Sequence, residues 1–112
     1  MRRVHELAIS QAVVEAVLER TGDRSVRCLR LAVGRLSGVV PDALRFSFEL
    51  VTEGTPLQGA EMVIEEPAGR ARCRGCGADF GIDDLVLLCP CGSADVAVTA
   101  GHELLIRSVE VA

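Results

Sequence analysis

The sequence predicts an α+β fold in which two helices pack on a small, mainly antiparallel sheet and a four-cysteine subdomain is inserted before the last strand. Three observations predict it: two segments with helical periodicity, three with the alternation of strands, and two close cysteine pairs in a stretch that has neither. With 112 residues the chain has the length of one domain. We expect residues 1–69 and 101–112 to form an α/β domain and residues 70–100 to form the inserted subdomain.

The first helix is expected over residues 7–20. Its apolar residues recur at steps of three and four: Ile9, Val13, Ala16 and Val17. Ser10 is among the polar residues that fall on the opposite side, which we expect to face solvent. The helix should end at Thr21 and Gly22, because glycine suits the left-handed conformation that closes many helices.

Three segments have the alternation that is typical of strands. In the first, residues 25–38, one side carries Leu29, Leu31 and Val33 and the other Cys28, Arg30 and Ala32. A lone thiol is more often packed than reactive, so Cys28 is interpreted as structural. The other two segments are residues 61–66 and 102–111. The last has no partner of its own, so we expect it to return to the first sheet.

The second helix is expected to begin at Pro41, because proline suits the first turn of a helix. The apolar residues of its buried side follow at helical spacing: Leu44, Phe48 and Val51. Gly54 and Pro56 should end this helix, since neither residue favours its continuation.

Four of the five cysteines crowd into one short stretch, as the pairs Cys73-x2-Cys76 and Cys89-x-Cys91. Two such pairs can place four thiolates at the corners of a tetrahedron, the arrangement that zinc takes with sulfur ligands. A closed four-thiolate site leaves no open position, so this zinc is predicted to be structural. Two disulfides, or an iron centre on the same thiolates, are the alternatives. The second pair is one residue short, which should strain its turn or alter the backbone donors that reach sulfur.

The composition of the chain argues against several classes of protein. A net charge of −4 argues against a surface that neutralises many phosphates. No run approaches the roughly 18 apolar residues of a membrane span, and no signal-peptide core is visible. We therefore expect a cytoplasmic protein with no membrane or nucleic-acid partner. An enzyme lacks support, because no nucleophile and base pair is apparent and the predicted metal site is closed.

Four segments, in the same order, resemble the HypA/HybF family, the nickel metallochaperones of nickel–iron hydrogenase maturation. They are HELAIS, LRLAVGRLSGVVPDALRFSFELVTEGT, CRGC…CPCGS and the closing GHELLIRSVEV. The resemblance covers nearly the whole chain. It implies a nickel-binding α/β domain beside a zinc-ribbon-like subdomain whose zinc is held by four cysteines: Cys73, Cys76, Cys89 and Cys91.

Carried over by position, the resemblance makes His5 the nickel ligand and Glu6 its neighbour in the site, with backbone nitrogens and sometimes the glutamate or the terminal amine contributing. Imidazole nitrogen suits Ni(II). The resemblance implies a non-enzymatic carrier that delivers Ni(II) for hydrogenase and, in some organisms, for urease. The implied partners are a nickel-handling GTPase and the hydrogenase large-subunit precursor. A homodimer formed by exchange of the zinc segment is compatible with its flexible loops.

The N-terminus departs from the family pattern, in which the chain begins Met-His-Glu. Here Met-Arg-Arg-Val precedes His5, so Val4 stands where the family has its initiator. Because GTG encodes valine internally but methionine at a start, one hypothesis is that the chain begins at position 4 in the cell. Its rival is that the longer chain is real, which would place the terminal amine too early to join His5 in a compact chelate.

The competing interpretation comes from another class: a zinc-ribbon module that binds nucleic acid or joins a transcription complex. Arg70, Arg72 and Arg74 flank the first cysteine pair and could contact phosphates. The acidic composition counts against this interpretation, as does the presence of only one aromatic residue near the cysteines, Phe80.

Overall fold

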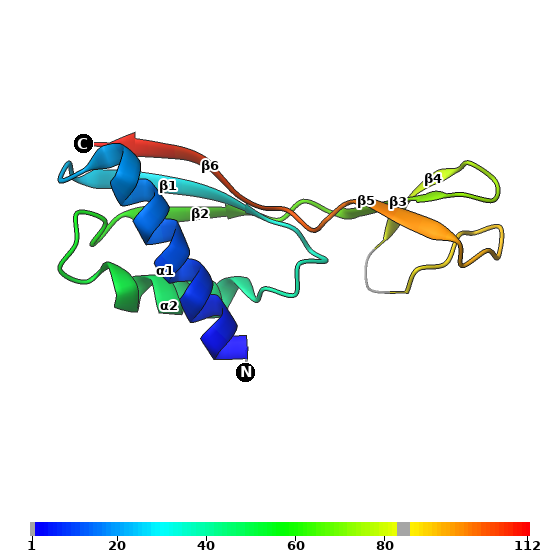
Figure 1. Cartoon of the computed structure of the whole chain (residues 1–112), viewed down its shortest axis with the longest axis horizontal. Coiled ribbons are helices and arrows are strands. Elements are labelled where there is room, and N and C mark those ends of the chain that lie inside the picture. Colours follow the sequence, from blue (N-terminus) through cyan, green and yellow to red (C-terminus); the bar gives the residue numbers. More distant parts are fainter. Residues whose placement is uncertain (1, 83–85) are drawn as a thin grey trace. The chain divides into compact units, whose positions relative to one another are not determined.

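The computed structural model describes the backbone of residues 2–82 and 86–112, and the side chains of residues 5–82 and 86–112. Within these ranges the elements follow in this order (Figure 1): α1 (Arg2–Thr21), β1 (Val26–Val33), α2 (Pro41–Thr52), β2 (Glu61–Glu65), β3 (Gly69–Cys73), β4 (Asp79–Ile82), β5 (Val96–Ala100) and β6 (Leu104–Val111). Neither described helix is long and apolar enough to cross a membrane.

The chain divides into two compact units. The first comprises Met1–Leu31, Val39–Ile64 and Leu105–Ala112, and the second comprises Ala32–Gly38 and Glu65–Leu104. The boundaries expected from the sequence, after residues 69 and 100, did not assign the segment Ala32–Gly38 to the part that contains the cysteine pairs. That the two parts are separate domains stays a prediction.

The first unit is built on a three-stranded sheet in the order β2-β1-β6. The last strand therefore returns to the first sheet, as the sequence predicts. The N–H of Ala112 donates to the carbonyl oxygen of Ser25 (2.9 Å), and the N–H of Gly34 donates to that of Glu103 (2.8 Å). These bonds join opposite ends of the two segments, so β6 is antiparallel to β1. In β1 the exposed Arg30 stands between the buried Leu29 and Leu31, as the predicted alternation requires, but Ala32, expected on the same side as Arg30, is buried. Both helices lie on one side of this sheet (Figure 1).

The first helix differs from its prediction in two ways. It begins at Arg2 rather than Leu7, because apolar periodicity marks only the part of a helix that packs. Its buried side is also rotated, and consists of Glu6, Ser10, Val14 and Val17. Placing Ser10 on the solvent side was therefore wrong: its side chain is small enough to face α2, and its hydroxyl donates to the carbonyl oxygen of Leu44 (3.4 Å). The predicted end at Gly22, with φ +61°, is confirmed.

The second helix begins at Pro41, as predicted, and ends at Thr52. Leu44 and Phe48 are buried, whereas Val51 is only half-buried. Thr52 is buried in its place, because its Oγ1 donates to the carbonyl oxygen of Phe48 (2.8 Å) and so satisfies the hydroxyl inside the fold.

The second unit contains another three-stranded sheet, in the order β4-β3-β5, with both pairs antiparallel. Its small core consists of Leu36, Ala71 and Ile82, with Phe80, Val96 and Val98 packed against it. None of these three strands was predicted from the sequence. In β3 arginines alternate with small residues rather than with large apolar ones, so the usual strand signal is weak. Leu36 arrives from a distant segment, which no local pattern indicates.

Candidate metal centre

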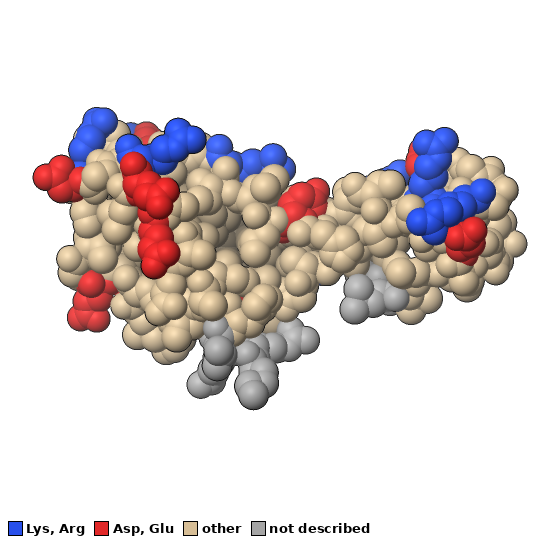
Figure 2. Space-filling view, viewed as in Figure 1, with Lys and Arg blue, Asp and Glu red and all other residues tan. Residues whose placement is uncertain are grey.

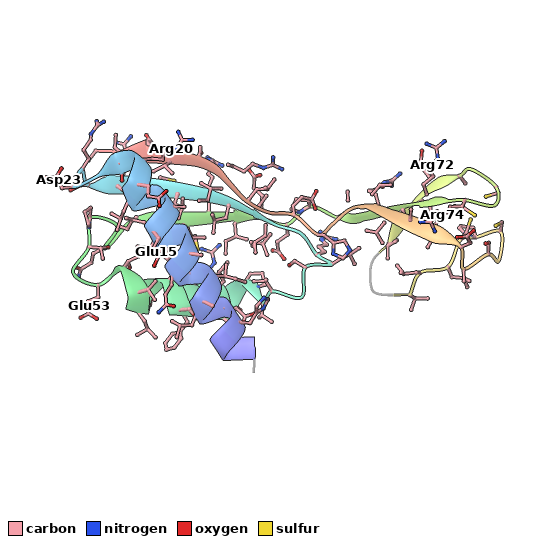
Figure 3. All side chains as sticks on the ribbon, viewed as in Figure 1. Glu15, Arg20, Asp23, Glu53, Arg72 and Arg74 are labelled. Atoms are coloured by element: carbon pink, nitrogen blue, oxygen red, sulfur yellow. The ribbon has the colours of Figure 1, made fainter. Side chains whose placement is uncertain are left out.

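The second unit brings four cysteine side chains together at one end of its sheet (Figure 3). Cys73 is the last residue of β3 and Cys76 lies in the turn that follows. Cys89 and Cys91 lie in the turn that precedes β5. The four Sγ atoms are all within 4.8 Å of one another. Cys73 and Cys89 are buried, and the other two are exposed.

The spacing of the sulfur atoms fits a tetrahedral metal site. The Sγ atoms are 3.8 Å apart for Cys73 and Cys91, and 3.6 Å apart for Cys76 and Cys89. Ligands at about 2.3 Å from a tetrahedral zinc ion are about 3.8 Å from one another. A disulfide needs about 2.05 Å, so these distances describe free thiols. A set of four soft thiolate donors suits zinc or iron. The donor set and its spacing therefore fit a structural metal ion held entirely by protein.

The first cysteine pair lies in a tight turn whose backbone N–H groups bond to Cys73. The backbone N–H of Cys76 donates to the Sγ of Cys73 (3.4 Å), and the N–H of Gly77 donates to the carbonyl oxygen of Cys73 (2.9 Å). Gly77 has a φ of +79°, a conformation that side chains disfavour. The turn thus presents one sulfur that already accepts a hydrogen bond, which favours its thiolate form.

The second pair, although one residue shorter, uses the same two interactions. The N–H of Cys91 donates to the Sγ of Cys89 (3.5 Å), and the N–H of Gly92 donates to the carbonyl oxygen of Cys89 (2.8 Å). Gly92 again has a positive φ, +97°. In both turns the second cysteine donates to the sulfur and the closing residue is glycine. The donor is nevertheless three residues beyond Cys73 but only two beyond Cys89, and Cys73 has a further backbone donor, Gly75, so the shorter pair does alter the donors that reach sulfur.

The surroundings move the pKa values of the two buried thiols in opposite directions. At Cys73 the N–H of Cys76 is the main cause, and it lowers the pKa to about 6 by stabilising the thiolate. At Cys89 the N–H of Cys91 also lowers the pKa, but burial and the neighbouring thiols together outweigh it and raise the pKa to about 12. Four thiolates at this spacing repel one another, and a divalent cation would remove that repulsion.

The arginines next to the cysteines have acidic neighbours. Arg70 and Arg72 are exposed on β3, and Arg74 is exposed in the turn that follows it. Arg74 forms an ion pair with Asp95 (2.8 Å), and Arg72 is paired in register with Asp79 of β4. Figure 2 shows acidic side chains beside the basic ones on this unit. The mixture reduces the positive potential that nucleic-acid binding requires.

The two residues predicted to hold nickel have different surroundings on α1. His5 is exposed, whereas Glu6 is fully buried. Oε2 of Glu6 accepts a hydrogen bond from the backbone N–H of Val40 (3.0 Å). Oε1 of Glu6 is buried and has no hydrogen-bond partner among the described residues. The imidazole is therefore available to a ligand from solvent, while the carboxylate is used inside the fold.

Glu6 supplies the acceptor that the start of α2 lacks. Val40 is the N-cap residue of α2, and its own side chain caps nothing. The first N–H groups of a helix need acceptors, and a carboxylate there also interacts favourably with the helix dipole. No Ser, Thr, Asp or Asn directly precedes Pro41, so the sequence offers no side-chain cap at this position. The contact with Glu6, which accepts from the N–H of Val40 itself, depends on tertiary packing.

The comparisons with known proteins agree over nearly the whole chain. The family model described as hydrogenase/urease nickel incorporation, metallochaperone, HypA, matches residues 4–111. The hydrogenase maturation factor HypA of Geobacter metallireducens is 43% identical over 109 residues, which cover 96% of this chain and 99% of that protein. The hydrogenase maturation factor HypA of Streptomyces avermitilis is 46% identical over 112 residues, covering 95% and 86%.

Solved structures share the fold. The solution structure of the Ni metallochaperone HypA from Helicobacter pylori aligns with a TM-score of 0.66 at 20% identity, and the alignment covers 95% of this chain and 96% of that one. This likeness shows that the two chains share their fold. The family match and the identity to relatives go further: this chain belongs to the HypA family of nickel-incorporation metallochaperones.

Proposed function

We propose that this protein binds Ni(II) near its N-terminus and delivers it for assembly of a hydrogenase metal centre, without catalysing a reaction itself. Membership of the family supports nickel handling. The observation that carries the N-terminal site is the exposed imidazole of His5 beside a glutamate that is anchored inside the fold. Delivery requires an ion that can enter and leave, and an exposed ligand on an anchored segment meets that requirement.

His5 is the principal ligand in this proposal, and Glu6 contributes through its backbone nitrogen. Nitrogen donors hold Ni(II) more firmly than the earlier divalent metals of the first row. The Glu6 carboxylate is fully buried and its Oε2 accepts from the N–H of Val40, so only Oε1 remains to join, and that oxygen would first have to become exposed. The terminal amine is a further donor if the chain begins at position 4.

The four-cysteine site is proposed to hold structural Zn(II) through Cys73, Cys76, Cys89 and Cys91. The donor chemistry and the sulfur spacing support this assignment. Zinc has no redox chemistry, and four protein ligands leave it no open position. Its role would be to join the end of β3 to the turn that precedes β5. The proposed protein partners are a nickel-handling maturation GTPase and the hydrogenase large-subunit precursor, with urease and a second copy as further candidates.

Calorimetric titration of Ni(II) into zinc-loaded protein tests the nickel site. Two wild-type chains are compared, one that starts at Met1 and one that starts with methionine at position 4. We expect one Ni(II) to bind, and His5→Ala to weaken binding at least about 100-fold, since even residues that only orient a metal ligand contribute about 10–100-fold.

His102→Ala is the matched control, because His102 is the other histidine of the chain and is also exposed. It should leave nickel binding unchanged. If His5→Ala binds as wild type does, or if wild type binds no nickel, the proposal fails. The zinc-ribbon adaptor interpretation would then lead, and a gel shift at increasing salt would test it.

A further inference from the structure

The outer surface of the two helices carries an apolar groove that neither metal site uses. The groove has a volume of about 440 Å³ and is lined by Leu7, Asp42, Ala43, Phe46, Ser47 and Leu50. Ligand-binding clefts commonly measure about 300–1,000 Å³, so it is large enough to receive several side chains.

Two large apolar residues of α2 are left in water along this groove. Phe46 is 60% exposed and Leu50 is 55% exposed, and they lie one helical turn apart. Other residues of α2, among them Leu44 and Phe48, form its buried side. The outer side of a surface helix is normally polar, so an apolar pair at this spacing is not needed for folding and indicates a contact with another molecule.

The apolar pair of α2 has acidic neighbours. Asp42 lines the groove, and the exposed Glu49 and Glu53 follow Phe46 and Leu50 by three residues each. The guanidinium of Arg45 is engaged elsewhere, because it donates to the carbonyl oxygen of Met62 in β2 (2.6 Å). Arg20 lines a different cavity, beside β6. Figure 3 shows Glu53 just beyond the end of α2, and Glu15 and Arg20 along α1.

We propose that this groove docks an amphipathic helix of a partner protein, with its apolar side flanked by lysine or arginine. The groove lies between two helices and offers no strand edge, so an occupant must bind through side chains. A helix does this with apolar residues at positions i, i+3 or i+4, and i+7. Basic flanks complement Asp42, Glu49 and Glu53 beside the apolar pair. A second copy of this chain would bring the same acids, and like charges would oppose it.

The docking goes beyond the proposed nickel function and does not require it. Leu7, which lines the groove, follows two residues after His5 on α1. A docked partner helix would therefore lie next to the segment at which nickel binding is proposed. Peptide binding can be measured without nickel, so the two ideas can fail separately.

Fluorescence anisotropy with two labelled synthetic peptides tests the proposal. Both peptides carry leucines at the same helical spacing; one has flanking lysines and arginines, and the other has glutamates in their place. We expect zinc-loaded, nickel-free protein to bind the basic peptide at least about tenfold more tightly, and this preference to weaken as salt is added.

Phe46→Ser with Leu50→Ser should reduce binding of the basic peptide about tenfold or more, because the central apolar contacts of an interface dominate its affinity. Both residues are exposed, so the fold should persist, which circular dichroism checks. Leu105→Ser on β6 is the matched control, since Leu105 is 50% exposed and lies outside the groove. Glu49→Lys with Glu53→Lys should remove or reverse the preference for the basic peptide.

The proposal is overturned if the two peptides bind alike, if neither binds, or if the groove variants bind as wild type does. An equal loss in Leu105→Ser would overturn it as well, since binding would then be generally hydrophobic. Sedimentation of the protein without peptide tests whether a second copy of the chain occupies the groove. A dimer that is lost in the variant with Phe46→Ser and Leu50→Ser would assign the groove to that second copy. A wild type that binds the basic peptide but no nickel would refute only the proposed nickel function.

Discussion

The carboxylate of Glu6 and the backbone N–H of Val40 join the first turns of α1 to the start of α2, with 3.0 Å between Oε2 and the nitrogen. Glu6 is fully buried, while the preceding His5 is exposed. One short segment thus carries an anchored side chain and a solvent-facing one. The anchor limits where the imidazole can move, because it fixes the backbone to which the imidazole is attached.

Removing this anchor should destabilise the first unit. We expect Glu6→Ala to lower the free energy of unfolding by about 2–3 kcal/mol, because it deletes a charge-assisted acceptor and leaves the N–H of Val40 without a partner. Glu6→Gln keeps an oxygen acceptor and should cost clearly less. Urea denaturation of the zinc-loaded proteins measures both. Equal midpoints for Glu6→Ala and wild type would show that the hydrogen bond does not stabilise the fold.

The crossing of the two helices should not tolerate a larger residue at position 10. Ser10 is fully buried and faces Leu44 across the helix pair. We expect Ser10→Leu to cost about 1–3 kcal/mol through overpacking. Ala12→Leu, at an exposed position of the same helix, is the matched control and should stay close to wild type. The denaturation midpoints decide: a shift of the same size in both variants would argue against tight packing at Ser10.

Loss of one metal-site cysteine should affect the second unit selectively. Cys89→Ser leaves three thiols, so we expect the bound metal to be lost and the amides of β3 to β5 to lose protection from hydrogen exchange. The ellipticity of α1 and α2 should be retained, because their buried contacts lie in the first unit. Cys28→Ser, in β1, should keep both the metal and the protection. If the Cys89→Ser protein still bound a full equivalent of metal, Cys89 would not be a ligand.

Metal affinity at the four-cysteine site should fall as the pH is lowered. Bound cysteines must be thiolates, so protons compete with the metal. The pKa of Cys89, raised to about 12, means that binding at neutral pH must displace its proton. The pKa of Cys73, lowered to about 6, means that below this pH a further proton competes and the dependence steepens. Chelator competition at several pH values measures the slope. A flat profile would contradict ligation by these thiols.

Nickel coordination by backbone nitrogen should unwind the first turn of α1. His5 and Glu6 lie within this helix, and a metal-bound amide nitrogen has given up the proton that its helical hydrogen bond needs. We expect faster hydrogen exchange at the first residues of α1 when Ni(II) is added to wild type, and no change in His5→Ala. Unchanged exchange in nickel-loaded wild type would restrict the ligands to side chains.

Features that depend on local backbone geometry were predicted correctly, whereas several features that depend on distant contacts were not. Pro41 and Gly22 were placed correctly at helix ends, because each acts through its own backbone conformation. The cysteine pairs were identified because their spacing is itself the signal. Ser10 was assigned to the wrong side of α1, because a serine reads as solvent-facing unless a neighbouring helix needs a small residue at that position. The strand β3 was missed because its stability depends on Leu36 and the cysteine turns.

The sequence by itself determined the two helices, the return of the last strand to the first sheet, the cysteine quartet and the family resemblance. These follow from spacing along the chain, which local backbone geometry converts directly into structure. Only the tertiary structure decided that Glu6 is buried against Val40 and that Leu36 belongs to the core of the second unit. It also showed Phe46 and Leu50 exposed beside a groove. The burial of a side chain depends on which distant segments pack against it, and no local sequence pattern shows which segments those are.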